Sequence, residues 1–337
     1  MNDDSIAPDR LVRLGYAFRE AKTLLSAVEL DVFTVLAAGR LGLDELATRT
    51  GVHRRGARDF FDALVSLRLL ERDDAGRYGN TPETDLYLDR RKGSYVGGEL
   101  EFANARQFGP WSLFSEALRS GTPQSGARGT ANYRAYYSDA AVLDSVAKGM
   151  TGGTLRVADA IAERFPWRDY TTLIDIGTAQ GCLPVRIALA HPHIVGGGFD
   201  LPAMGGLFDA YVRQHGLAER LRFHPGDFFH EPLPTADVLV MGRVLHNWDL
   251  AGKKLLLSKA YDALPAGGAL IVYERLIDDE RRTNTAGFMA SLNMLVMTAG
   301  GFDYSGADCK EWMNHAGFHH VDITSLTTEQ SMVVARK

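Results

Sequence analysis

A buried strand that runs straight into a glycine-bounded turn is the feature that most narrows the folds open to this chain. Residues 172–176 have an apolar strand pattern, Gly177 and Gly181 bound the turn, and a helix is predicted at 184–189. Gly181 allows the backbone to turn tightly against whatever binds there. In a doubly wound sheet, a ligand lies beyond the carboxyl ends of the strands, where such a loop leads into a helix. Residues 175–181 therefore predict a site for a nucleotide-type cofactor.

Strands and helices continue to alternate after this turn. The further segments with a strand pattern are residues 193–200, 236–241, 267–273, 321–323 and 332–335, with a helix predicted at 253–264. Strands separated by helices imply a parallel, doubly wound sheet, and the last two strands are close enough to form an antiparallel pair. The expected fold class over residues 166–337 is therefore α/β, a Rossmann-like doubly wound sheet with a C-terminal antiparallel hairpin.

The first part of the chain has a different pattern. Residues 1–95 show helix, turn, helix and a polar hairpin tip in order, which is a winged-helix pattern. Arg54, Arg55 and Arg58 open the helix that would enter a DNA groove, but Phe and Leu dominate its remainder. We therefore favour a packing module over a DNA-binding one. Residues 96–165 are expected to be helical, with many aromatic side chains, and to form a linker that contributes to a substrate pocket.

Composition limits the setting of the protein. A chain of 337 residues suits two domains, and a net charge of -5 gives no general reason to approach nucleic acid. Cys182 and Cys309 are the only cysteines, which fits a reducing compartment. The first residues are polar and acidic, and no apolar run reaches about 18 residues, so we expect neither a signal peptide nor a membrane span. The expected location is the cytoplasm.

The residues around the turn distinguish between possible cofactors. Asp200 ends the next strand, where its carboxylate can accept hydrogen bonds from both hydroxyls of a ribose, as in sites for NAD and for S-adenosylmethionine. The turn lacks GxGxxG, however, and Asp175 just before it suits a cationic cofactor better than a pyrophosphate. Asp227 and Phe228 follow a later strand, where they could bracket an adenine. No P-loop is present. These features favour S-adenosylmethionine.

Taken in order, these segments resemble a known family. Residues 175–181, Asp200, 226–228, 246–248 and Glu274 look like the two-domain small-molecule O-methyltransferases of class I, which include caffeate-type, acetylserotonin-type and bacterial tailoring enzymes. The resemblance covers nearly the whole chain. It implies S-adenosylmethionine as the cofactor, a small-molecule substrate, and a homodimer formed through the N-terminal domain.

The resemblance also implies roles for individual residues. The catalytic set is His246 as general base with Glu274 and Asp303 as supporting acids. The expected cofactor-binding residues are Asp175, Gly177, Gly181, Asp200, Leu201, Asp227, Phe228 and Arg243. The expected substrate-binding residues are Tyr133, Tyr137, Trp248, Met289 and Asn293.

The chemistry supports a base independently of the family. Methyl transfer from a sulfonium is an in-line displacement that requires nucleophile, carbon and sulfur to be aligned. A hydroxyl becomes a far better nucleophile when its proton is removed, and a His can supply about 10²–10⁴-fold in this way. A carboxylate on the other ring nitrogen fixes the tautomer and stabilises the imidazolium. O-methylation with His246 as base is the expected reaction.

Three departures from the family pattern leave the acceptor open. Asn247 stands where many relatives have Asp, residues 178–180 are poor in glycine, and Gly242 with Arg243 replaces a Lys four residues before the His. The alternative is an S-methyltransferase of a small thioether acid, of the 4-methylthio-2-hydroxybutyrate type used in dimethylsulfoniopropionate synthesis. Arg243 or Arg275 could then pair with the acceptor's carboxylate, and Tyr133, Tyr136 and Tyr137 could face the forming sulfonium.

Other functions remain possible from the residues alone. The chain could be a winged-helix regulator that senses S-adenosylmethionine, or an NAD(P) oxidoreductase. We expect no metal, since Asp278 and Asp279 stand in a charged surface run and the adjacent His319 and His320 would point to opposite faces of a strand.

Overall fold

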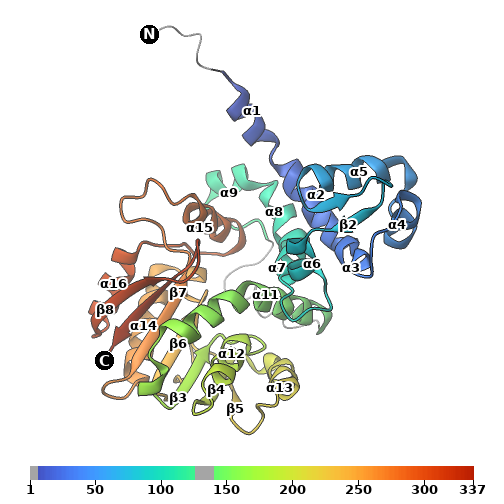
Figure 1. The fold of residues 1–337 in the computed structure, drawn as a ribbon. Helices are drawn as coiled ribbons and strands as arrows, with labels where there is room; N and C mark the ends of the chain where they lie inside the picture. The colour runs from blue at the N-terminus through green and yellow to red at the C-terminus, as the bar shows by residue number, and fades with distance from the viewer. Residues whose placement is uncertain (1–6, 126–139) are drawn as a thin grey trace. The chain divides into compact units, whose positions relative to one another are not determined.

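The computed structural model describes residues 7–125 and 140–337 (Figure 1). The backbone divides into two compact units, Met1–Ala105 and Arg106–Lys337. The expected three-way division at residues 95 and 165 stays a prediction. Tyr133, Tyr136 and Tyr137 lie outside the described residues.

The N-terminal unit is mainly helical, and its small hairpin has the expected position. Its elements are α1 (Asp9–Tyr16), α2 (Phe18–Glu29), α3 (Val32–Leu36), α4 (Leu43–Thr50), α5 (Arg54–Ser66), β1 (Leu70–Arg72), β2 (Tyr78–Asn80), α6 (Pro82–Leu88) and α7 (Gly97–Phe102). β1 and β2 pair antiparallel, which confirms the helix, turn, helix and hairpin order. α5 begins at Arg54, and the His53 ring caps it by accepting a hydrogen bond from the Arg55 N–H.

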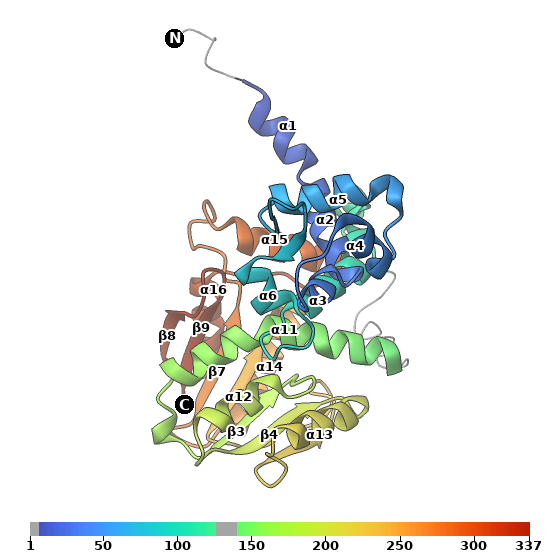
Figure 2. The same ribbon diagram turned by 45° about the vertical axis from the view of Figure 1, so that its right-hand side comes forward.

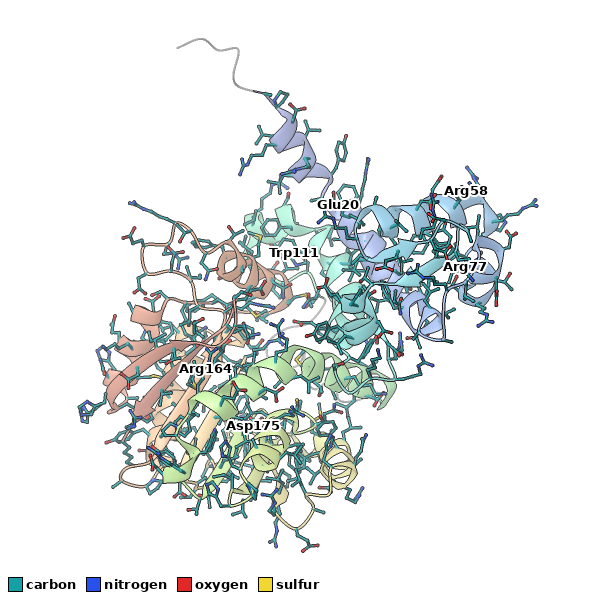
Figure 3. All side chains as sticks on the ribbon, viewed as in Figure 1. Glu20, Arg58, Arg77, Trp111, Arg164 and Asp175 are labelled. Carbon is teal, nitrogen blue, oxygen red and sulfur yellow. The ribbon has the colours of Figure 1, made fainter. Side chains whose placement is uncertain are left out.

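The helices of this unit differ in how much of their surface is buried. Phe33, Phe61 and Leu64 pack into one apolar core from α3 and α5. α1 contributes no buried residue, and Leu11 and Leu14 are 67% and 66% exposed. Arg58 projects from α5 at the surface of the unit (Figure 3).

The C-terminal unit is built on a seven-stranded sheet. Its strands are β3 (Thr172–Ile176), β4 (Val195–Asp200), β5 (Leu221–Pro225), β6 (Val238–Gly242), β7 (Ala269–Glu274), β8 (His319–Ser325) and β9 (Ser331–Arg336). They lie in the order β5-β4-β3-β6-β7-β9-β8. β9 pairs antiparallel with both of its neighbours, β7 and β8, and the first five strands of this order pair parallel to one another. The expected doubly wound α/β fold with a C-terminal hairpin is confirmed.

Helices cover both faces of this sheet (Figure 2). The helices on the sheet are α11 (Ala140–Arg164), α12 (Cys182–Ala190), α13 (Gly205–Gln214), α14 (Leu250–Ala263) and α16 (Gly306–His315). Three further helices of this unit, α8 (Phe108–Trp111), α9 (Phe114–Ser120) and α15 (Thr285–Met297), pack against one another. Successive strand residues point to opposite faces, so Leu239 packs with α14 and α16, while Val238 and Val240 pack with α11 and α12. Because helices cover both faces, the strands are almost wholly buried. A ligand can therefore bind only at the edge of the sheet where the strands have their carboxyl ends.

Candidate active site

The turn after β3 is held in a conformation that favours glycine. Gly177 and Gly181 have φ angles of 75° and 89°, and α12 begins at Cys182. A Cβ atom on Gly181 would come within 2.7 Å of the Phe208 ring. The Gly177 N–H donates to the Phe199 carbonyl at 2.8 Å, which fixes the turn against β4. The strand, turn and helix therefore form as the sequence predicted.

Asp200 joins this turn to the end of β4. Its carboxylate is buried and accepts hydrogen bonds from the backbone N–H of Ala179 at 2.8 Å and of Leu201 at 2.7 Å. Its carbonyl accepts from the Gly226 N–H at 2.9 Å, just after β5. Backbone groups from three strand ends thus fix Asp200 at the carboxyl edge of the sheet, two of them at its carboxylate and one at its main-chain carbonyl.

Two more acids flank Asp200. Asp175 is buried at the end of β3 (Figure 3), and burial raises its pKa to about 7, with the Thr178 hydroxyl lowering it and the Asp200 charge raising it. Asp227 follows Gly226 and accepts from the Phe229 N–H at 2.9 Å. The edge therefore offers a cationic or hydroxyl-rich ligand three carboxyl groups from three successive strands.

Aromatic rings connect Asp227 to the next strand end. The rings of Phe228 and Phe229 lie edge-on to Trp248, with centroid distances of 5.8 Å and 4.5 Å. Trp248 follows the short turn of helix at Leu245–Asn247, which comes after β6. The residues expected around an adenine thus contact the loop that carries His246.

His246 lies between the two acids that the sequence paired with it. Its Nδ1 is 3.2 Å from Asp303 Oδ1 and 3.6 Å from Glu274 Oε2, and its backbone N–H donates to Glu274 Oε1 at 3.3 Å. The side chains of Asp303 and Glu274 are 0% and 1% exposed. Since both carboxylates face Nδ1, that atom carries the proton, and Nε2 remains the basic nitrogen.

The charges in this cluster set its proton affinity. Burial acts to lower the pKa of His246, but Glu274 and Asp303 outweigh it and raise that pKa above its ordinary value, while Arg243 lowers it. Burial raises the pKa of Glu274, against the lowering effect of His246. The two groups compete for one proton, so the base belongs to a coupled cluster.

One departure from the family pattern, Gly242 with Arg243, has a local physical cause. Arg243 adopts a left-handed φ of 55°, its N–H donates to the Tyr273 carbonyl at 3.0 Å, and its guanidinium acts on His246 and Glu274. A Cβ atom on Gly242 would lie 1.9 Å from the Tyr273 ring. The position where relatives have Lys therefore has no room for a side chain in this protein, and Arg243 supplies the nearby cation instead.

α15 contributes side chains near the same loop. The Asn293 side-chain oxygen accepts from Trp111 Nε1 at 2.8 Å, and the Asp303 N–H donates to Ser291 Oγ at 3.1 Å. Met289 is 45% exposed. Trp111 lies close to α15 (Figure 3). Of the expected substrate residues, Trp248 and Asn293 are in contact with named partners, whereas Tyr133 and Tyr137 lie outside the described residues.

The surroundings of Arg275 and Lys253 differ from what the sequence pattern indicated. Arg275 pairs with Glu329 at 3.2 Å, which weakens its case as a partner for an acceptor's carboxylate. The sequence pattern did not predict a role for Lys253, which is fully buried and whose charge interacts with Glu274 and Asp303. Its place on the apolar side of α14, three and four residues before Leu256 and Leu257, was the available signal.

The same cluster could accept a metal ion on spacing alone. Within residues 7–125 and 140–337, one ligand atom from each of His246, Glu274 and Asp303 lies within 4.8 Å of the others. Two cationic side chains, Arg243 and Lys253, already act on these acids, which disfavours a further cation. The absence of a metal stays a prediction.

Comparison with known proteins places the chain among methyl-transferring proteins. A family model described as the O-methyltransferase domain matches residues 111–319, and one described as the O-methyltransferase dimerisation domain matches residues 12–90. Among the described residues, no helix has the length and apolar character needed to cross a membrane.

Relatives of this chain act on different acceptor atoms. The chain is 39% identical to the tetracenomycin polyketide synthesis 8-O-methyl transferase TcmO of Streptomyces glaucescens, covering 98% of this chain and 97% of that protein. It is 37% identical to the N,N-dimethyltransferase OxyT of Streptomyces rimosus, covering 91% and 90%. The structure of human N-acetylserotonin methyltransferase in complex with S-adenosylmethionine superimposes with a TM-score of 0.91, 25% identity, and coverage of 100% and 99%.

Proposed function

Because the chain belongs to the O-methyltransferase family, we propose that it methylates a hydroxyl group and that His246 removes the hydroxyl proton. As a family member it is an S-adenosylmethionine-dependent methyltransferase that acts on small molecules. The relatives described above give no support to a thioether acceptor, to a regulator or to a nicotinamide-dependent oxidoreductase.

The observation that carries the proposal is the placement of both buried acids on Nδ1 of His246. The Nδ1–H is donated to Asp303, so the lone pair of Nε2 is free to take a proton from an acceptor. As that proton arrives, the two carboxylates stabilise the imidazolium. A hydroxyl acceptor needs such a base because a neutral alcohol or phenol is a poor nucleophile.

The cofactor residues fit S-adenosylmethionine. When bound, the cofactor supplies an electrophilic methyl group on a sulfonium. We assign the ribose hydroxyls to Asp200, the adenine edge and face to Asp227 and Phe228, and the cationic methionine end to the side of the turn near Asp175. The inward, buried carboxyls at Asp175 and Asp200 support this arrangement, since each would complement a cation or a hydroxyl donor.

For the acceptor we infer an aromatic hydroxyl of a polyketide-like molecule. The similarity to the tetracenomycin enzyme supports this class, since that relative is an 8-O-methyl transferase of polyketide synthesis by name. The similarity to an N,N-dimethyltransferase makes an amine the second candidate. An amine carries its own lone pair and depends less on a base before transfer, so the buried His246 cluster favours the hydroxyl.

A paired acceptor screen tests the proposal. Purified protein is incubated with methyl-labelled S-adenosylmethionine and matched aromatic polyketides that carry either a hydroxyl or an amino group at the same position. Mass spectrometry should find label on the hydroxyl compounds. Label on the amino compounds alone would replace O-methylation by N-methylation, and labelling of neither would reject the acceptor class.

We also propose that the protein is a homodimer through its N-terminal unit. The match to the dimerisation domain supports this, as does α1, which has no buried residue and exposes Leu11 and Leu14. Light scattering after size exclusion should give twice the chain mass for the native protein. A Leu11→Asp/Leu14→Asp variant should shift towards the monomer, whereas an unchanged dimer would rule out α1 as the contact.

A further inference from the structure

Lys253 is a fully buried lysine on α14, directly after the loop that carries His246. Its residue exposure is 0%, as are those of Leu256, Leu257 and Ala260 on the same side of the helix. Burying an ammonium group without partners costs on the order of several kcal/mol. Nearby charges or hydrogen bonds must therefore compensate for the burial of Lys253.

Contacts with two loops hold the Lys253 ammonium in place. Nζ donates to the Trp248 carbonyl, and it lies 3.5 Å from the centroid of the Phe302 ring and 5.7 Å from that of Tyr304. A cation over an aromatic face is attracted to it. Trp248 ends the His246 loop, and Phe302 and Tyr304 flank Asp303. One side chain therefore ties together the loop of the proposed base and the loop of one of its acids.

The carboxylates around the ammonium provide its counter-charge. Burial lowers the pKa of Lys253 to about 8, and Glu274, Asp303 and Asp249 oppose that change. Glu274 Oε2 and Asp303 Oδ2 are buried and accept no hydrogen bond from residues that the structure describes. Each acid thus has one buried oxygen without a hydrogen bond from those residues, although Glu274 Oε2 lies 3.6 Å from His246 Nδ1, and the negative charge on that oxygen depends on nearby positive groups.

A count of charges shows what the lysine does for the cluster. With His246 neutral, the charges of the two buried acids, Glu274 and Asp303, are balanced by those of Arg243 and Lys253, whereas Asp249 is exposed and its charge is screened by solvent. Without Lys253 the cluster would carry one net negative charge, and a buried negative cluster takes up a proton at higher pH. That proton would occupy His246 or a neighbouring carboxyl, and either outcome removes the free base.

We propose that Lys253 is a positioning residue that keeps Glu274 and Asp303 ionised and thereby keeps His246 in its neutral, proton-accepting form at neutral pH. This inference rests on the proposed role of His246 as base. Nothing in it requires Lys253 to touch substrate or cofactor.

Three substitutions separate the charge of Lys253 from its hydrogen bond. Lys253→Arg keeps the charge, Lys253→Gln keeps a donor for the Trp248 carbonyl, and Lys253→Met keeps neither. The exposed neighbour Lys254, changed to Met, is the matched control. The measurements are the pH profile of kcat and the titration of the His246 imidazole by NMR in ¹⁵N-histidine-labelled protein, with His246→Ala identifying its signals.

In Lys253→Gln and Lys253→Met, we expect the acidic limb of the kcat profile to move to higher pH by about one unit. The midpoint of the His246 imidazole titration should move by the same amount. The expected loss of kcat at pH 7 is about 10-fold, with recovery towards pH 8.5. Lys253→Arg and Lys254→Met should keep the native profile. If Lys253→Met does not fold, Lys253→Gln carries the test.

Two outcomes would overturn the proposal. A native profile in Lys253→Gln would show that the hydrogen bond suffices and the charge does not matter. If the Tm of all three variants fell but the acidic limb of their kcat profiles stayed at the native pH, the role of Lys253 would be structural only. Failure of the base itself is separate: full activity in His246→Ala with a shifted titration in Lys253→Gln would reject the base and retain the role of Lys253.

Discussion

The two halves of the carboxyl edge of the sheet are built in different ways. In the cofactor half, Asp200 is fixed by backbone N–H groups of Ala179 and Leu201. In the catalytic half, Glu274 and Asp303 share one titratable partner, Nδ1 of His246, and the charges of Arg243 and Lys253 act on them. Backbone donors keep their charge state at every pH, whereas the side chains of the catalytic half titrate. The cofactor half therefore sets geometry, and the catalytic half sets a pH range.

Replacing His246 by Ala should have the largest effect, and it should be confined to the catalytic half. Loss of the general base is expected to lower kcat by at least ~100-fold. The affinity for S-adenosylhomocysteine, measured by calorimetry, should stay native because the backbone contacts of Asp200 are untouched. The control is His315→Ala, an exposed histidine at the end of α16. Near-native turnover would reject the base.

Replacing Asp200 by Ala should affect the cofactor half instead. Two backbone donors lose their acceptor and the ribose loses its partner, which we expect to weaken cofactor binding by roughly 10- to 100-fold. Turnover at saturating S-adenosylmethionine should fall much less. Asp209→Ala, on the exposed side of α13, serves as control. If kcat fell as much as affinity, the two halves would not be separable.

Replacing Glu274 by Gln should lower kcat about 10-fold and move the pH dependence. Glu274 raises the pKa of His246, so its neutral replacement should lower that pKa. The neutral form of His246 then persists to lower pH, and the acidic limb of the kcat profile should move to lower pH. Gln keeps an acceptor for the His246 N–H, which limits structural change. A limb that moved to higher pH would contradict the assigned coupling.

Replacing Thr178 by Val should have the smallest effect. The Thr178 hydroxyl lowers the pKa of Asp175, which burial raises to about 7. A carboxylate at Asp175 favours a cationic cofactor, so affinity should weaken as the pH falls through that pKa. Without the hydroxyl, the pKa rises further, and affinity at pH 7 should weaken by about threefold. Calorimetry from pH 6 to 8.5 checks this; a pH-independent affinity would remove Asp175 from the cofactor site.

The sequence predicted the cofactor half better than the catalytic half for a physical reason. The turn at Gly177 and Gly181, and Asp200 at the end of the next strand, are local features with fixed spacing, and the structure confirms their positions. His246, Glu274 and Asp303 converge only in three dimensions, and their grouping came from the family resemblance. Their roles remain predictions until the substitutions above are made.

Other features of the site depend on packing that the sequence does not reveal. The absence of Lys at position 242 looked like a gap in the family pattern, but the Tyr273 ring leaves no space there. Lys253 looked like an ordinary polar residue of α14, and only the contact with Phe302 and the nearby acids gives it a role. The His53 cap of α5 is a contact of the same kind, since the sequence pattern shows the helix but not the ring nitrogen that accepts from the Arg55 N–H.

The position of β9 between β7 and β8 has a consequence for how the protein is made. β7, whose six residues are all buried in the finished sheet, is complete at Glu274 but stays an open edge until residues 331–336 have been synthesised. An unpaired apolar edge strand invites pairing with other chains. A chain that stops before Ser331 would therefore leave β7 as an open apolar edge and should be prone to aggregation.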